Sequence, residues 1–207
     1  MVEDRSERSE ASDEALMARF QSGDRSAFNA LVRRHQTPLY NFAARLLRNQ
    51  GAAEEVVQDA FVRVVLNAAE FRHAAKFTTW LYTIARNLCI DASRKRALRN
   101  HPSLDESRRD DDGDGPTLGE RTADGRANVE RAAVAVEIRE RLTAAVDDLP
   151  DEQREVFLLR EVSNVPFRDI AAIVGVPENT VKSRMRYALE RLQAALSEFE
   201  EYARALR

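Results

Sequence analysis

The sequence predicts an all-α protein with two small helical domains joined by a flexible acidic linker. Only 7 glycines and 6 prolines occur among 207 residues, and Ala, Leu, Arg and Glu, which favour helices, are abundant. Apolar residues recur at three and four positions, which is the period of an amphipathic helix, and the alternation typical of strands is absent. A polar stretch at residues 99–128 separates two groups of such segments, so two domains are expected.

The first domain is expected over residues 12–98 and follows a disordered acidic tail at residues 1–11. Ser12 can cap a short helix that ends before Gly23. Three longer helices are then expected, at residues 26–47, 52–67 and 77–96. Pro38 predicts a break or kink in the first of them because proline lacks an amide hydrogen. Residues expected to face the core include Leu31, Leu39, Phe42, Val56, Ala60, Phe61, Val64, Val65, Leu81, Ile84, Ala85, Leu88 and Cys89.

The second domain is expected over residues 129–207. Helices at 129–149 and 151–162, separated by Pro150, precede a stretch with the spacing of a helix-turn-helix at residues 167–186. Gly175 permits the sharp turn, since a side chain there would cost energy, and Pro177 suits the first turn of the following helix. The apolar positions of this motif recur at helical spacing and are expected to be buried: Ile170, Ala171, Val174, Val181, Met185, Ala188, Leu189, Leu192 and Leu196.

Burying this stripe leaves a polar and basic face on the second helix of the motif. Its members are Asn179, Lys182, Ser183 and Arg186, with Arg184 on the flank. A helix of this kind fits the major groove, where Arg and Lys meet guanine or phosphate and Ser or Asn meets base edges. The alternative is a pair of amphipathic helices with solvated charges, because short helix-turn-helix matches also arise by chance.

Residues 71–96 interleave aromatic and basic side chains, which is the composition that single-stranded nucleic acid requires. Phe71, Phe77, Trp80 and Tyr82 lie among Arg72, Lys76, Arg86, Arg94, Lys95 and Arg96. Asn87 can hydrogen-bond a base edge, and Asp91 lies one turn further on the same face. Core packing of each aromatic residue is the competing interpretation, and the basic end of this helix also suits its dipole.

Charge and composition exclude several classes of protein. The formal net charge is −3, but acidic residues concentrate in residues 1–14 and 101–125, so the remainder of the chain is basic. A single cysteine, Cys89, rules out an internal disulfide framework and fits a reducing cytosol. No apolar run reaches membrane-spanning length, and the acidic start is unlike a signal peptide, so no membrane insertion is expected.

An enzyme is not expected, because no set of residues has the spacing of a catalytic or metal site. The three histidines, His35, His73 and His101, are scattered. Aspartates at 110–112 and 114 lack the ligand spacing of a calcium loop, so a solvated acidic tether is the preferred interpretation. Neither a cofactor nor a bound metal is therefore expected.

Four strings in order resemble the extracytoplasmic-function (ECF, group 4) sigma factors of bacterial RNA polymerase, within the sigma-70 family. They are AEEVVQDAFVRV at 53–64, FTTWLYTIARNLCID at 77–91, LPDEQREVFLLREV at 149–162 and the helix-turn-helix. The resemblance implies a non-catalytic, cytoplasmic initiation subunit that directs promoter-specific transcription, including that of stress-response genes. Residues 12–98 would be sigma region 2 and residues 129–207 sigma region 4.

The resemblance also implies three sets of binding residues. Region 2 would dock on core RNA polymerase, at the β′ clamp, through Glu55, Gln58, Asp59, Val62 and Arg63. It would bind the non-template strand of the minus-ten element through Phe71, Arg72, His73, Ala74, Lys76, Ile84, Asn87, Asp91, Arg94 and Lys95. Region 4 would read duplex DNA at the minus-thirty-five element through Arg168, Thr180, Lys182, Ser183, Arg184 and Arg186.

Two departures from the family pattern affect base preference. His73-Ala74-Ala75 stands where relatives often carry Gly, Asp or Ser, and Tyr187 stands where relatives commonly carry a basic residue. Further implied partners are the polymerase β subunit and an anti-sigma factor that hides both domains. A stand-alone helix-turn-helix regulator, which would need no polymerase, and a helical enzyme are the alternative readings.

Overall fold

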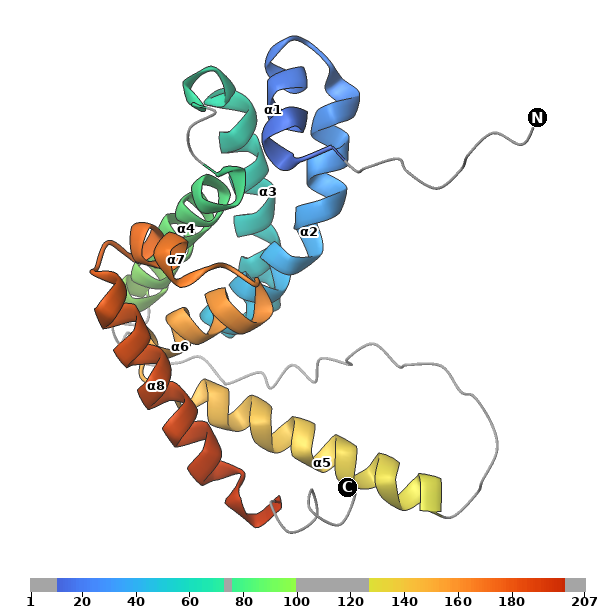
Figure 1. Ribbon diagram of the computed structural model, residues 1–207, viewed down its shortest axis with the longest axis vertical. Coiled ribbons are helices and arrows are strands. Elements are labelled where there is room, and N and C mark those ends of the chain that lie inside the picture. Colours follow the sequence, from blue (N-terminus) through green and yellow to red (C-terminus); the bar gives the residue numbers. More distant parts are fainter. Residues whose placement is uncertain (1–10, 73–75, 100–126, 200–207) are drawn as a thin grey trace, which may run out of the picture.

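The computed structural model describes residues 11–72, 76–99 and 127–199, and these residues are helical with no strand among them (Figure 1). The N-terminal half contains α1 (Asp13–Gln21), α2 (Arg25–Leu47), α3 (Gln50–Leu66), η1 (Ala68–Glu70) and α4 (Phe77–Arg99). The C-terminal half contains α5 (Ala127–Asp147), α6 (Asp151–Phe157), η2 (Leu158–Val162), α7 (Phe167–Val174), α8 (Glu178–Ala195) and η3 (Ser197–Phe199). The predicted all-α class is confirmed, while the expected acidic tail up to residue 10 and most of the expected linker lie outside the described residues.

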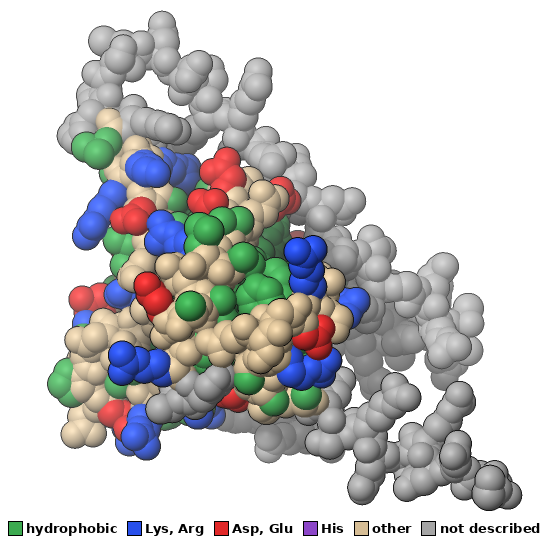
Figure 2. Space-filling model, turned by 90° about the horizontal axis from the view of Figure 1, so that it is seen from above, with side chains coloured by type: hydrophobic (Ala, Val, Ile, Leu, Met, Phe, Trp, Pro, Cys, Tyr) green, Lys and Arg blue, Asp and Glu red, His purple; other side chains and the backbone are tan. Residues whose placement is uncertain are grey.

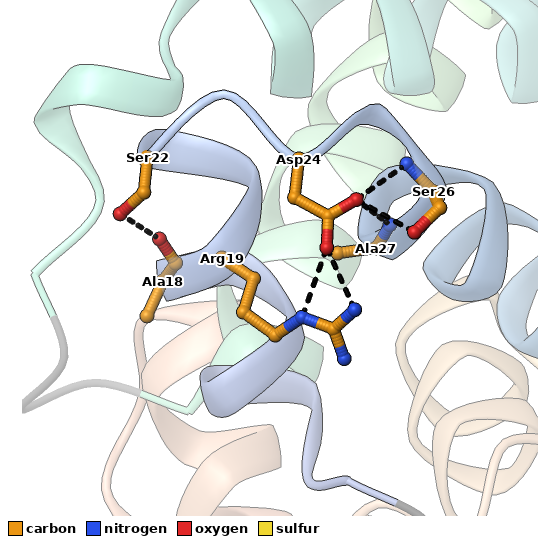
Figure 3. A network of polar contacts seen from close by, with 6 residues as sticks. All are labelled: Ala18, Arg19, Ser22, Asp24, Ser26 and Ala27. Atoms are coloured by element: carbon orange, nitrogen blue, oxygen red, sulfur yellow. Dashed lines mark hydrogen bonds and ion pairs between the residues drawn. The ribbon is translucent and has the colours of Figure 1, made fainter.

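A network of polar contacts shapes the turn from α1 to α2 (Figure 3). The carboxylate of Asp24 caps α2 by accepting from the Ser26 amide at 2.9 Å and the Ser26 hydroxyl at 2.6 Å, and it pairs with Arg19 Nη2 at 2.6 Å. The Ser26 hydrogen bond first, and Arg19 second, lower the pKa of Asp24 to about 2. Gly23 has φ +98°, a conformation that glycine adopts without strain.

Helix α2 passes through Pro38 without interruption, so the break that was one of the two outcomes predicted near residues 35–37 is wrong. Proline removes one backbone hydrogen bond inside a helix and crowds the preceding turn, at a cost of about 3 kcal/mol. Leu31, Leu39 and Phe42 lie on both sides of it and are fully buried. Burial of large apolar side chains along the whole length of α2 offsets that cost.

The helix predicted at 151–162 changes character at its midpoint. It is α-helical to Phe157 and then continues as the wider π-helical turn η2. The amide of Ser163 accordingly donates to the carbonyl of Leu158, five residues earlier, at 3.2 Å. Apolar periodicity does not distinguish the two helix types, because Leu158 and Leu159 are buried in either case.

Two residues expected in the core lie on the surface instead. Val65 on α3 is 43% exposed and Leu189 on α8 is 48% exposed. Each sits at the margin of a stripe whose other members are buried, such as Val64 and Ala188. A helix buries only the arc that faces its neighbours, so a sequence period overestimates the width of the buried face.

Candidate nucleic-acid and polymerase interfaces

The helix-turn-helix is built as its sequence predicts. Helix α7 ends at Gly175, which has φ +74°, and the Gly175 amide donates to the Ala171 carbonyl at 2.9 Å. Pro177 then stands at the N-cap of α8, directly before its first residue. The contact between the helices buries Ile170 and Ile173 on one side and Val181, Met185 and Ala188 on the other. This packing fixes which face of α8 points to solvent.

The residues predicted to read duplex DNA lie mostly on that solvent face. Arg168, Lys182, Ser183 and Arg186 are exposed and Thr180 is half-buried. Arg184 differs, because its Nη2 lies 2.7 Å from Glu152 Oε2 and only 19% of its side chain is exposed. The structure therefore gives Arg184 a contact that ties α8 to the start of α6.

On the first domain, α4 carries the residues predicted to bind a single strand. Ile84, Asn87 and Asp91 follow one another at three and four positions and share one face of the helix. Ile84 is half-buried, whereas Asn87 and Asp91 are exposed. Arg94 and Lys95 are exposed further along the same helix, so a polar stripe leads from an apolar start to a basic end.

The aromatic residues of this segment form a cluster rather than an open row. Phe77 and Tyr82 are buried, and Phe71 is only 5% exposed. The Phe71 ring centroid lies 5.2 Å from that of Trp80 and 6.1 Å from that of Phe77. Trp80 alone is partly exposed, so core packing accounts for most of these rings in this arrangement. Arg72 is exposed, and His73 and Ala74 lie outside the described residues.

The predicted polymerase-docking residues form an exposed stripe along α3. Glu55, Gln58, Asp59, Val62 and Arg63 all face solvent. Beside the stripe, α2 and α3 enclose an apolar groove of about 470 Å³, lined by Phe28, Val32, Val57, Phe61, Val62, Val65 and Leu66 among others. Val62 is 54% exposed and Leu66 is 75% exposed, so this surface combines charged and apolar groups as interfaces do.

Seen from the end that carries α1, hydrophobic side chains also gather in the middle of the surface, with basic and acidic side chains around them (Figure 2). The part of the chain that the structure describes has no cluster of three or more His, Cys, Asp or Glu side chains able to hold a metal ion. Among the described helices, none has the length and apolar character needed to cross a membrane.

The two halves contact each other through α4 and α7 and through α2 and η2 (Figure 1). Lys76 Nζ pairs with Asp169 Oδ2 at 2.7 Å, and Arg86 Nε pairs with Glu155 Oε1 at 2.5 Å. Both carboxylates are nearly buried, with 14% and 11% of their side chains exposed. The sequence did not predict the ion pairs of Asp169 and Glu155. An acidic residue on a helix is expected to face solvent unless its partner, distant in the sequence, is known.

Within this contact, burial is the main influence on the pKa of Tyr82. It raises that pKa, and the nearby Ser163 side chain opposes the shift. Burial likewise raises the pKa of the nearby Cys89 thiol to about 12, with a smaller contribution from the Glu155 carboxylate. The thiol is therefore protonated at neutral pH and behaves as a core side chain.

The fold is that of a two-part helical protein with a helix-turn-helix in its C-terminal half. Residues 31–99 match the family described as Sigma-70 region 2, and residues 139–192 match Sigma-70, region 4. These two matches correspond to the two helical halves of the chain.

Relatives of known family match nearly the whole chain. It is 32% identical to the ECF RNA polymerase sigma factor SigW of Bacillus subtilis over 84% of its own length and 91% of the relative. It is 34% identical to the ECF RNA polymerase sigma factor SigM of Mycobacterium tuberculosis, over 91% and 87% respectively. It is 32% identical to the ECF RNA polymerase sigma-E factor of Escherichia coli, over 86% and 91%. The chain therefore belongs to the ECF sigma factors of RNA polymerase.

Solved structures share the fold. CnrH, solved with the cytosolic domain of CnrY, aligns with a TM-score of 0.62 at 24% identity over 91% of this chain and 99% of that one. RpoE of Bartonella quintana, solved with the anti-sigma factor NepR, aligns with the same TM-score and identity over 82% and 96%. Both solved proteins therefore share the helical fold of this chain over nearly their whole length.

Proposed function

We propose that the two domains of this sigma factor divide the work of promoter recognition. Residues 12–98 dock on core RNA polymerase and bind the melted non-template strand of the minus-ten element. Residues 129–207 hold the minus-thirty-five element as duplex DNA, and the segment between the domains acts as a tether. The observation that carries this proposal is the pair of separate polar faces, on α4 and on α8, each backed by a buried apolar stripe.

Each face suits the nucleic acid assigned to it. The α8 face presents Lys182, Ser183 and Arg186 on the side opposite the buried stripe that packs α8 into the domain core, as major-groove recognition requires. The α4 face presents an amide and a carboxylate between an apolar end and a basic end. Such a surface can contact bases that have left the stack and hold their backbone by charge.

Polymerase docking is proposed for the exposed α3 stripe and the groove beside it. Apolar contact with Val62 would supply affinity, and Gln58 and Asp59 would set orientation. Tethering then makes the second DNA contact effectively intramolecular, so two modest interfaces act as one strong one. In this scheme the protein carries out no catalysis, works in the cytoplasm where the polymerase transcribes, and is held inactive by an anti-sigma factor that covers both domains.

The experiment is association with bacterial core polymerase, followed by run-off transcription from a random promoter library with and without the chain. Association together with new start sites supports the proposal. Val62→Glu should weaken association by about thirtyfold, the scale of one interface hot spot, whereas Arg45→Ala, on the exposed side of α2, should not. Duplex binding that is indifferent to polymerase would instead favour a stand-alone regulator.

A further inference from the structure

Helix α1 holds both described ends of the segment that connects η1 to α4. At one end, Gln21 Nε2 donates to the carbonyl oxygens of Ala68 at 2.7 Å and Phe71 at 3.1 Å. At the other end, the Phe77 amide donates to Glu14 Oε1 at 3.0 Å. Residues 73–75, within this segment, lie outside the described part, and none of the contacts used below involves them.

The spacing of the two side chains explains how one short helix reaches both ends. Glu14 and Gln21 are seven residues apart, which is two turns and about 10 Å along the same face of a helix. Met17 lies between them on that face and is fully buried. Glu14 and Gln21 therefore lie on either side of the buried Met17, and one reaches the start of α4 while the other reaches η1.

The backbone groups that they contact lie at the ends of η1 and α4 or next to them. The Phe77 amide belongs to the first turn of α4, where amides lack an intrahelical acceptor. The Glu14 side chain supplies the missing acceptor through Oε1. The Ala68 carbonyl belongs to the first residue of η1, and the Phe71 carbonyl follows its last residue, where the aromatic cluster begins.

Helix α1 is itself fixed against α2, so it can act as a rigid support. Asp13 Oδ2 lies 2.7 Å from His35 Nε2, and Asp13 Oδ1 lies 2.5 Å from Arg34 Nη1. Burial pushes the pKa of Asp13 upward, but the hydrogen bonds from His35 and Arg34 outweigh it and leave the pKa lowered. The His35 ring centroid also lies 5.5 Å from that of Phe77, so α2 contacts the first residue of α4 as well.

We infer that Glu14 and Gln21 are positioning residues for single-strand recognition: their hydrogen bonds to Phe77, Ala68 and Phe71 hold the start of α4, and the aromatic cluster packed beneath it, in the orientation in which the exposed face of α4 receives unpaired bases. This inference rests on the proposed function of α4. Neither side chain touches DNA in this scheme. They act through backbone atoms, so the effect of replacing them depends on hydrogen-bonding capacity rather than on charge.

The test uses the full chain bound to core polymerase, with a pool of randomised single-stranded DNA and a pool of randomised duplex DNA as probes. Glu14→Met and Gln21→Met keep side-chain length but remove the acceptor and the donor. Each should weaken retention of the single-stranded pool by roughly fivefold, the scale of one hydrogen bond. Duplex retention and polymerase affinity should stay at the wild-type level, since α8 and α3 are untouched.

Two further variants separate positioning from folding. Glu14→Gln keeps an acceptor oxygen and should restore single-strand retention to the wild-type level. Arg19 lies on the same short helix, pairs with Asp24 at the N-cap of α2, and contacts neither end of the segment, so Arg19→Ala should also bind as the wild type does. Hydrogen exchange of the Phe77 amide should quicken in Glu14→Met and not in Glu14→Gln.

Unchanged single-strand retention in both methionine variants would overturn the inference, as would a parallel loss of single-strand, duplex and polymerase binding. The latter pattern would mean that the contacts only stabilise the fold. If the wild-type complex itself retained no single-stranded DNA, the proposed function of α4 would fail, and this inference would fall with it. Wild-type retention with unaffected variants would leave the proposed function intact.

Discussion

Lys76 Nζ and Asp169 Oδ2 lie 2.7 Å apart and join the start of α4 to the first helix of the helix-turn-helix, although 93 residues separate them along the chain. Lys76 belongs to the set proposed to hold the melted strand. Its cation is engaged by a carboxylate from the other domain in this arrangement, so contact between the domains and contact with DNA phosphate compete for one charge.

This competition predicts that neutralising the carboxylates opens the molecule. Asp169→Asn combined with Glu155→Gln removes the negative charges that pair with Lys76 and Arg86, and should increase the radius of gyration of the free chain in X-ray scattering. The wild type should expand similarly as salt is raised, because screening weakens partly exposed ion pairs. Glu178→Gln, which breaks a pair within α8, is the control. An unchanged radius in the double variant would show that the ion pairs do not hold the domains together.

The proposed major-groove contacts predict a defined salt dependence. Lys182→Ala and Arg186→Ala should each weaken binding of the polymerase complex to promoter duplex. Each lost phosphate contact should lower the slope of log affinity against log salt by about one. Arg191→Ala removes an exposed cation further along the same helix and should leave the slope unchanged. Equal slopes for all four proteins would rule out phosphate contacts by Lys182 and Arg186.

The lowered pKa of Asp24 predicts a pH-dependent contribution to stability. The pKa falls from the ordinary 3.8 to about 2 in the folded chain. The stabilisation is therefore complete above about pH 4 and is lost as the pH falls towards 2. Asp24→Asn keeps the capping oxygen but loses the charge. Its Tm should lie below that of the wild type at neutral pH and approach it in acid, whereas Asp148→Asn controls for the loss of an exposed carboxylate. A constant Tm difference across this range would contradict the prediction.

Two glycines predict opposite responses to alanine. Gly175 has φ +74°, and a Cβ there would meet no atom within 4 Å, so only backbone strain opposes the change. Gly175→Ala should cost about 1–2 kcal/mol of unfolding free energy. Gly51 lies in α3, and its nearest neighbour to an added Cβ is Asn49 Oδ1 at an ordinary 3.7 Å. Gly51→Ala should be neutral or stabilise by up to about 1 kcal/mol, measured by thermal unfolding. A lower unfolding free energy for Gly51→Ala than for the wild type would contradict the prediction that helix propensity alone determines its effect.

Local pattern predicted those features whose cause is local. Glycine at 175 and the helical period of α8 were enough to assign the turn and the exposed Lys182 and Arg186. Arg184 was expected on the DNA face with them, but its contact with Glu152 lies 32 residues back in the chain, where no local pattern marks it. The same limit applies to Arg86 and Glu155, and to every contact between the domains.

Two further kinds of feature could not be predicted from the sequence: those that depend on competing energies, and hydrogen bonds from side chains to distant backbone atoms. The break expected at Pro38 fails because burial on both sides of it outweighs a known local penalty. The support that α1 gives to α4 involves backbone atoms as partners of Glu14 and Gln21. Any sequence offers such atoms everywhere, so only the three-dimensional arrangement identifies which of them are used.

The most direct test of the two-module account is a map of RNA 5′ ends made by core polymerase on a random promoter library, with the wild type, Asn87→Ala and Lys182→Ala compared. The account predicts that the wild type enriches two separated sequence elements upstream of the start. Asn87→Ala should lose selection at the downstream element alone, and Lys182→Ala at the upstream element alone. Loss of both elements in either variant, or start sites identical to those of polymerase without the chain, would contradict it.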